Sequence, residues 1–165
     1  MRIGVVSDSH GRQPAVIAAL GQLRERGVKT VLHCGDIEDA ETVALFRGLD
    51  AHFVFGNCDW DKEALRAAIQ EVGATLHEHW GQLELAGVKL AFLHGDDKDL
   101  MREVENSGAF DYLFYGHTHI AREDRVGETW VINPGALFRA ATKTCLLLDL
   151  ATGERRPIEV LPDRS

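Results

Sequence analysis

Five short runs of apolar residues recur along the chain, and each run ends in a cluster of polar residues. The runs cover residues 3–6, 30–33, 52–55, 90–93 and 112–115. They are rich in β-branched and aromatic residues and are closed by Gly or Asp, which is typical of buried strands. Ligands of an open α/β sheet bind beyond the carboxyl ends of its strands, so the five polar clusters are expected to converge on one pocket.

Helical segments separate the first three of these strands and follow the third. Apolar periodicity predicts helices over residues 14–27, about 40–49 and 61–72. Val43, Ala44 and Phe46 are expected on the inner face of the second helix, and Asp61 is expected to cap the third. Alternation of strands and helices in this order favours parallel strands joined by crossover helices.

The second half of the chain follows another pattern. Residues 80–85 and 88–93 flank Ala86-Gly87 and predict a hairpin, and a short helix is expected over residues 98–106. Further strands are expected over residues 121–126, 129–132, 143–149 and 155–160, mostly antiparallel. A parallel half joined to an antiparallel half predicts two sheets packed face to face with helices outside. No linker interrupts the pattern, so residues 1–165 are expected to form a single domain.

Composition narrows the classes of function. The 165 residues carry a formal net charge of −8, which leaves no basic surface for non-specific binding to nucleic acid. The three cysteines, Cys34, Cys58 and Cys145, are widely spaced, which indicates reduced thiols and no thiolate zinc site. No signal peptide or membrane span is recognisable, so we expect a cytoplasmic protein without a membrane partner.

The polar clusters at the strand ends supply three Asp, one Asn and four His candidates for a metal site. These clusters are Asp8-Ser9-His10, Gly35-Asp36, Gly56-Asn57-Cys58-Asp59, His94-Gly95 and Gly116-His117-Thr118-His119. Oxygen and imidazole donors without thiolates favour Mn²⁺, Fe²⁺, Zn²⁺ or related ions. The number of donors exceeds what one ion needs, and a bridging carboxylate would let them hold two ions for displacement at phosphorus.

The motifs Asp-x-His, Gly-Asp, Gly-Asn-x-Asp, His-Gly and Gly-His-x-His, in this order, resemble those of the calcineurin-like metallophosphoesterases. The chain is most similar to the small single-domain phosphodiesterases of bacteria and archaea. This resemblance implies an α/β fold, namely a four-layer α-β-β-α sandwich of two mixed sheets flanked by helices. It also implies two divalent transition-metal ions, with Mn as first choice and Fe, Zn, Ni or Co as alternatives.

The resemblance also implies a role for each site residue. Asp8, His10 and His119 would hold the first metal, Asn57, His94 and His117 would hold the second, and Asp36 would bridge both. A hydroxide between the metals would be the nucleophile. Each of Asp8, Asp36 and Asn57 alone could cap a turn, but four histidines at matching positions argue against that explanation for the full set.

The chain departs from the family at Cys58, where much of the superfamily has a histidine that is thought to protonate the leaving group. The catalytic candidates are Asp36, Asn57 and His94, with Cys58 and Asp59 as further ones. A turn or helix-cap role is an equally good expectation for Asp59. For His33, packing within its strand is favoured over support of the metal ligands.

The expected function is hydrolysis of a small phosphoester, with phosphodiesters favoured over monoesters. An alternative from another class is an interaction scaffold of the same fold, resembling the retromer subunit. Nuclease activity is a third alternative, which the acidic charge and the absence of an added DNA-binding domain disfavour. The sequence leaves open whether the chain forms a homo-oligomer.

Overall fold

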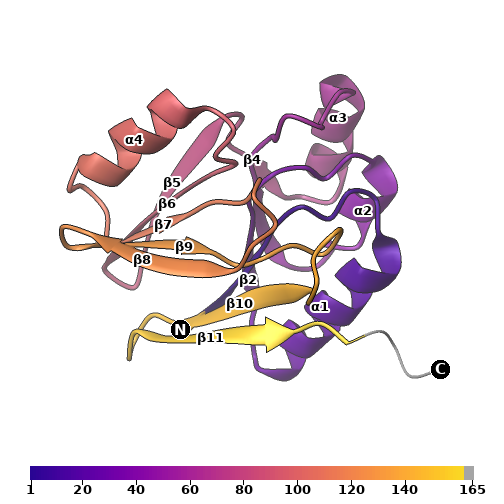
Figure 1. Cartoon of the computed structure of the whole chain (residues 1–165). Helices are drawn as coiled ribbons and strands as arrows, with labels where there is room; N and C mark the ends of the chain where they lie inside the picture. The colour runs from indigo at the N-terminus through magenta and orange to yellow at the C-terminus, as the bar shows by residue number, and fades with distance from the viewer. Residues whose placement is uncertain (162–165) are drawn as a thin grey trace.

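The computed structural model describes residues 1–161 and consists of two β-sheets packed face to face between helices (Figure 1). The first sheet contains, in spatial order, β11 (Glu154–Glu159), β10 (Thr144–Asp149), β1 (Arg2–Val6), β2 (Thr30–His33), β3 (Asp50–Phe53) and β4 (Thr75–Leu76). The second contains β5 (Trp80–Leu85), β6 (Val88–Leu93), β7 (Tyr112–Phe114), β9 (Thr129–Asn133) and β8 (Arg122–Val126). The helices are α1 (Gln13–Glu25), α2 (Ala40–Ala44), α3 (Lys62–Glu71) and α4 (Lys98–Asn106).

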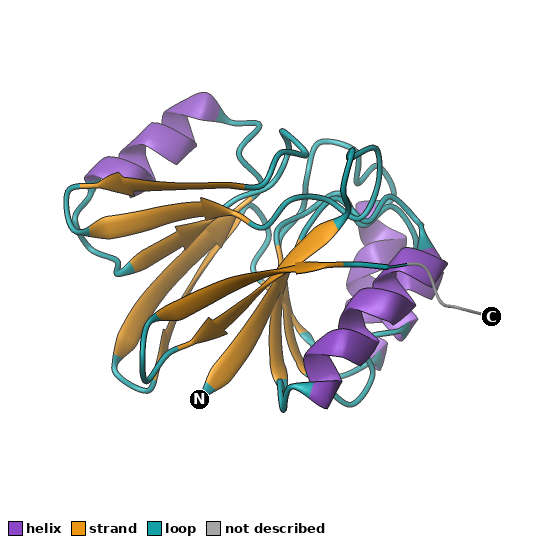
Figure 2. Cartoon of the chain, turned by 60° about the horizontal axis from the view of Figure 1, so that its bottom comes forward, coloured by secondary structure: helices purple, strands orange, loops and turns teal. Residues whose placement is uncertain are grey.

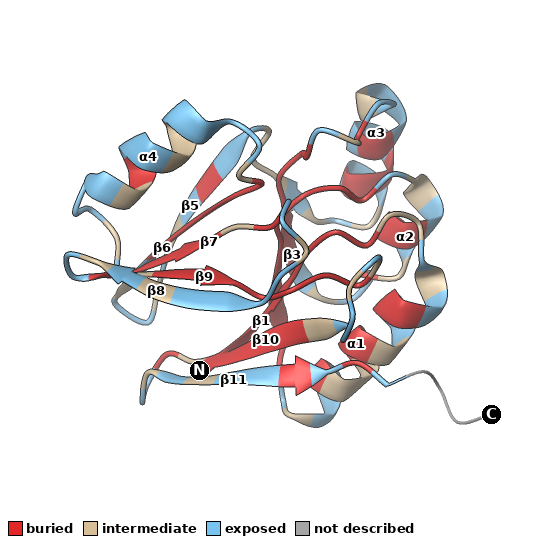
Figure 3. Ribbon diagram, in the orientation of Figure 1, coloured by how far each residue is buried: buried red, intermediate tan, exposed pale blue. Residues whose placement is uncertain are grey.

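The two sheets share one apolar core, and each has a second core under its helices. Ile3, Val5 and Leu32 of the first sheet pack with Leu90 and Phe92 of the second, and all five are essentially inaccessible to solvent. Neighbouring strand residues face the other way, because side chains of a strand alternate between its faces. The layers are therefore helix, sheet, sheet and helix, and buried strands run through the middle of the molecule (Figures 2 and 3).

The outer layers follow the predicted helices. Helices α1, α2 and α3 cover the first sheet, where Val6 and Val31 pack beneath them. Helix α4 covers the second sheet through Val104, which packs on Ala91 and Leu113. The expected four-layer α-β-β-α sandwich of two mixed sheets is confirmed.

The second helix differs from its prediction. Residues 40–49 were expected to be helical, but α2 ends at Ala44, and the backbone continues in tighter turns with bonds such as Phe46 N–H to the Val43 carbonyl. Val43 and Phe46 are buried as predicted, whereas Ala44 is exposed and Thr42 faces inward. Positions 42, 43 and 46 share one helix face by their spacing of three and four, and position 44 lies on the other face.

The sheets do not correspond to the two halves of the sequence. Strands β6, β7 and β9 are parallel neighbours in the second sheet, with β5 and β8 antiparallel at its edges. Strands β10 and β11 return to the first sheet, where β10 pairs antiparallel with β1. The short strand β4 was not predicted, because two residues are too few to show a period. The remaining predicted strands agree within two residues of the observed bounds.

The loops after β1, β2, β3, β6 and β7 meet at one end of the sandwich. Backbone bonds tie them together: Asp8 N–H donates to the Gly35 carbonyl at 3.0 Å, and Gly116 N–H donates to the His94 carbonyl at 2.9 Å. The predicted convergence of the polar clusters is thus observed. Within residues 1–161, no helix combines the length and apolar character that a membrane span requires.

Candidate metal centre

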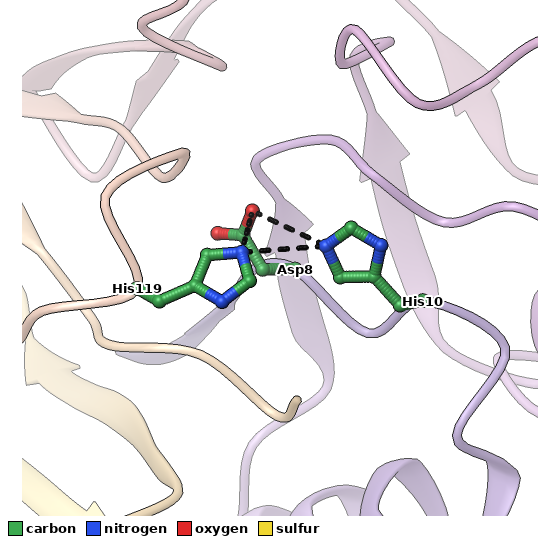
Figure 4. Close-up of side chains that lie close together, drawn as sticks. All are labelled: Asp8, His10 and His119. Carbon is green, nitrogen blue, oxygen red and sulfur yellow. Dashed lines mark hydrogen bonds and ion pairs between the residues drawn. The ribbon is translucent and has the colours of Figure 1, made fainter. Parts of the chain in front are cut away.

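One group of donors comes from the loops after β1 and β7. Asp8, His10 and His119 point toward one another, as Figure 4 shows. His119 Nε2 lies 3.2 Å from Asp8 Oδ1 and 3.3 Å from His10 Nε2. His10 Nε2 is also 3.9 Å from Asp8 Oδ1. These three residues were assigned to the first metal from the sequence, and the structure brings their donor atoms together.

Hydrogen bonds leave the donor atoms of this group open toward its centre. His10 Nδ1 lies 2.7 Å from Glu38 Oε1, a carboxylate that can only accept, so Nδ1 carries the proton and Nε2 is free to donate a lone pair. Asp8 Oδ2 accepts from the Ser7 hydroxyl at 2.7 Å and from His117 N–H at 3.1 Å. Asp8 Oδ1 is buried and has no hydrogen-bond partner within residues 1–161. A cation would satisfy this orphaned oxygen.

A second group joins the loops after β3, β6 and β7. Asn57 Oδ1 lies 2.9 Å from His94 Nε2 and 3.1 Å from His117 Nδ1. His94 Nδ1 lies 2.8 Å from the Cys34 carbonyl, so this nitrogen donates there and Nε2 faces the centre of the group. The predicted second trio, Asn57, His94 and His117, is therefore also assembled.

Asp36 lies between the two groups. Its Oδ2 is 3.5 Å from His10 Nε2 and 3.3 Å from His94 Nε2, whereas its Oδ1 accepts from Cys58 N–H at 2.8 Å. One carboxylate oxygen thus faces a histidine of each group. This is the placement that a bridging ligand requires.

The electrostatics of the cluster call for positive charge at its centre. Burial raises the pKa of Asp8. Burial alone would lower the pKa of His94, but its hydrogen bond to Asp36 and the carboxylate charges raise it to about 9. Burial is likewise outweighed at Asp36, where His94 holds the pKa at about 2. Divalent cations offset the same buried carboxylate charge.

The backbone around the cluster is held in an unusual conformation. Several of the predicted ligands have positive φ angles, a region that residues other than glycine rarely adopt. They are Asp8 (52°), His10 (45°), Asp36 (57°), His117 (67°) and His119 (59°). Such conformations cost about 1–3 kcal/mol each and concentrate at functional sites, where the surrounding structure enforces them.

Two glycines permit the close approach of these loops. A Cβ added to Gly56 would collide with Asp36 Oδ1, and a Cβ added to Gly116 would collide with Ser7 Oγ and Asp8 Oδ2. Both glycines precede predicted ligands in their motifs. The absence of a side chain at these two positions therefore lets the loops bring the donors into contact.

Asp59 supports the loop that carries Asp36. It is 1% exposed, and its two carboxylate oxygens accept from the backbone N–H groups of Asp36, Ile37, Glu38 and Gly56 at 2.7–2.9 Å. All of these donors are backbone groups, so the arrangement favours the turn role over direct contact with substrate. Asp59 thereby fixes the orientation of Asp36.

Cys58 faces the centre from its rim. Its sulfur lies in one cluster with His10 and Asp36, where the donor atoms are within 4.8 Å of one another. Burial, followed by the charge of Asp36, raises the pKa of this thiol to about 11. A thiol with this pKa stays protonated near neutrality and is a weak acid.

Sequence reasoning did not find several residues that complete the cluster. Glu38 orients His10, and Ser7 donates to Asp8. Phe138 packs with its ring centroid 5.3 Å from that of His10, and the Arg12 guanidinium lies 4.4 Å above the Phe138 ring. Ser7 directly precedes the first motif and Glu38 lies two residues after Asp36, and this closeness to predicted motifs is the only signal they offered. Phe138 has none, because its loop reaches the site only in the folded chain.

A comparison with known families agrees with this geometry. A profile of the calcineurin-like phosphoesterase superfamily domain matches residues 1–153. The chain belongs to this superfamily. The phosphodiesterase MJ0936 of Methanocaldococcus jannaschii is 28% identical over 163 residues, which cover 96% of this chain and 98% of that protein.

Two solved structures share the fold of this chain. One described as a novel archaeal phosphodiesterase aligns with a TM-score of 0.89 at 27% identity, covering 96% of this chain and 99% of its own. Vps29 of Entamoeba histolytica, solved with zinc, aligns with a TM-score of 0.66 at 17% identity, covering 98% of this chain and all of its own. At that identity the second likeness concerns the fold alone.

Proposed function

We propose that this chain is a metal-dependent phosphodiesterase whose centre holds two divalent ions. Asp8, His10 and His119 hold the first ion, Asn57, His94 and His117 hold the second, and Asp36 bridges them. The observation that carries the proposal is Asp36 Oδ2, placed between His10 Nε2 at 3.5 Å and His94 Nε2 at 3.3 Å. The buried Asp8 Oδ1, which lacks a hydrogen-bond partner within residues 1–161, gives independent support.

The chemistry of the donors fits this assignment. Carboxylate, amide and imidazole groups without a thiolate suit Mn²⁺, our first choice, and also Fe, Zn, Ni or Co. Two such ions would supply an activated water and offset charge on the phosphoryl oxygens. The residues fix the geometry: Glu38 orients His10, the Cys34 carbonyl orients His94, and Asp59 holds the Asp36 loop.

The substrate is proposed to be a small phosphodiester. The named archaeal relative is a phosphodiesterase, and Cys58 stands where a stronger proton donor would help a poor leaving group. A thiol whose pKa is about 11 gives little such help, so esters with good leaving groups should be turned over best.

The remaining assignments follow from the same observations. We propose that residues 1–165 form a single metallophosphoesterase domain in the cytoplasm, with no nucleic-acid partner. The superfamily match to residue 153 supports the single domain, and β11 extends the first sheet beyond that residue through its pairing with β10. An interaction scaffold would not need the full set of converging donors, which is why we place the enzyme first.

The test is a hydrolysis assay on protein loaded separately with Mn, Fe, Zn, Ni or Co. The proposal predicts faster turnover of bis(p-nitrophenyl) phosphate than of p-nitrophenyl phosphate with at least one metal. Asp36→Asn should lower kcat by at least about a hundredfold, because loss of support around a metal site alone costs up to that much. Faster turnover of the monoester would contradict the proposal that the substrate is a phosphodiester. Absence of hydrolysis with every metal would contradict the proposal that the chain is an enzyme.

A further inference from the structure

A cavity of about 480 Å³ opens beside the second donor group. Asn57 and His94 belong to its lining, so a ligand bound in it lies next to the proposed second metal. Gly56 and Asp59 of the metal-site loops also line it, and the rest of its wall includes Trp60, Lys62 and Leu100, which have no part in the metal centre. The cavity is large enough for a group the size of a nucleoside, since small-molecule sites begin at about 300 Å³.

Trp60 lines this cavity, and 86% of its surface is exposed to solvent. By contrast, Phe53 and Phe92 are fully buried in the cores, and Trp80, the other exposed tryptophan among the described residues, is only 36% exposed. An exposed indole contributes little to folding, but it offers a flat apolar face to a ligand. Its position beside the site is therefore better explained by binding than by packing.

The backbone on both sides of Trp60 is fixed. Asp59 accepts four backbone hydrogen bonds on one side, and Asp61 caps α3 on the other by accepting from Ala64 N–H at 3.0 Å. Trp60 N–H itself donates to the Cys58 carbonyl at 3.1 Å. A platform held in this way loses little entropy when a ligand stacks on it.

The remaining side chains that line the cavity indicate the chemistry of its ligand. Phe55, Leu93 and Leu100 supply apolar surface, and the Lys62 amine lies 5.5 Å from the Phe55 ring centroid. Asp96 and Asp97 are exposed and also line the cavity. Asp97 Oδ1 caps α4 by accepting from the N–H groups of Asp99 and Leu100. Two carboxylates beside one lysine in the cavity lining disfavour a second phosphate there, and the remaining carboxylate oxygens can accept hydrogen bonds from hydroxyl or amino groups of a ligand.

We propose that this cavity binds the nucleoside part of a nucleotide phosphoester, with the base stacked on Trp60 and the phosphate at the metal centre. This assignment rests on the proposed function and names its substrate class. Stacking supplies affinity for any base, because every base has a π-face. The phosphate group, which all these nucleotides share, binds at the metal centre.

The test measures binding to the manganese-loaded protein with two probes, adenosine 5′-monophosphate and inorganic phosphate. The wild type should bind the nucleotide at least about fivefold more tightly than phosphate. Trp60→Ala should remove this advantage and leave the affinity for phosphate unchanged, whereas Trp60→Phe should retain part of it. Trp80→Ala, which truncates an indole packed on Phe110 away from the cavity, is the matched control and should behave as wild type.

Equal affinity of the wild type for both probes would overturn the assignment, as would absence of binding or an undiminished advantage in Trp60→Ala. The hydrolysis assay separates this outcome from failure of the proposed function. If the protein hydrolyses phosphodiesters but binds the nucleotide no more tightly than phosphate, only the proposed nucleoside site is refuted. If the wild type binds the nucleotide more tightly than phosphate, Trp60→Ala does not, and no ester is hydrolysed, the nucleoside site is supported and the proposed hydrolase activity is refuted.

Discussion

His33 links the interior of the first sheet to the loop that carries Asp8 and His10. Its ring stacks on Phe53 with centroids 5.6 Å apart, its Nδ1 accepts from Gly35 N–H at 3.2 Å, and its Nε2 lies 2.9 Å from Ser9 Oγ. Because Nδ1 accepts, the proton is on Nε2, which donates to Ser9. The expected packing role is therefore combined with support for two loops of the metal centre.

The protonation of His33 predicts a pH dependence of stability. Burial, with the charge of His94, lowers the pKa of His33 in the folded state to about 3, against 6.5 for the free side chain. Below pH 6.5 the unfolded chain binds a proton that the folded chain does not, so stability falls as pH falls. Because of His33, the free energy of unfolding should fall by about 1 kcal/mol as the pH is lowered from 6 to 5.

The measurement is urea unfolding at several pH values in the presence of a chelator, for wild type and His33→Phe. Phenylalanine keeps the ring contacts with Phe46 and Phe53 but cannot titrate. The variant should lose less stability per pH unit than the wild type, whatever its stability at pH 7. Parallel pH profiles of the two proteins would show that His33 is not kept neutral by the fold.

At the scale of elements, the site depends on loops from two different sheets. Ser7 and Asp8 follow β1 of the first sheet, and Gly116 follows β7 of the second. His117 N–H donates to Asp8 Oδ2 at 3.1 Å, so the two loops are directly bonded. Packing of the sheets against each other and assembly of the donors are thus parts of one arrangement.

Gly116→Ala should disturb this junction, because its Cβ would overlap Ser7 Oγ and Asp8 Oδ2. Overpacking of this kind lowers the free energy of unfolding by about 1–3 kcal/mol, and we expect weaker manganese binding as well. Gly21→Ala is the control: a Cβ there meets nothing within 4 Å inside α1, and stability should rise by about 0.5–1 kcal/mol. Thermal unfolding of both variants measures the change in stability, and titration with manganese measures the change in metal affinity. Unchanged manganese affinity in Gly116→Ala would contradict the coupling of the loops to the site.

Elements with a long, regular pattern could be predicted from the sequence, and others could not. Helix α3 was predicted within a residue because Asp61 caps it and its apolar positions repeat. Helix α2 was predicted too long, since nothing local marks where its turns tighten before β3. The return of β10 to the edge of β1 depends on how the sheets pack, which no local pattern records. The candidate ligands were found because each belongs to a polar cluster that follows a strand and to a motif of the resembled family, whereas Glu38 and Phe138 reach the site through loop conformation.

At the scale of the whole molecule, the two sheets bring five loops to one end of the sandwich, and the donors divide into two groups that share Asp36. The superfamily match covers the chain to residue 153, so this architecture includes nearly all of the described residues. We propose that this architecture serves to hold two metal ions. Substrate class and the Trp60 cavity both depend on that centre.

The most direct measurement is the number of manganese ions bound per chain at saturation, by elemental analysis of dialysed protein. Wild type should hold about two ions, and Asp36→Asn about one or fewer, because it removes the carboxylate shared by both groups. Asp99→Asn removes an exposed carboxylate from α4 and should match wild type. One ion or none in saturated wild type, or an undiminished number in Asp36→Asn, would contradict the two-metal centre.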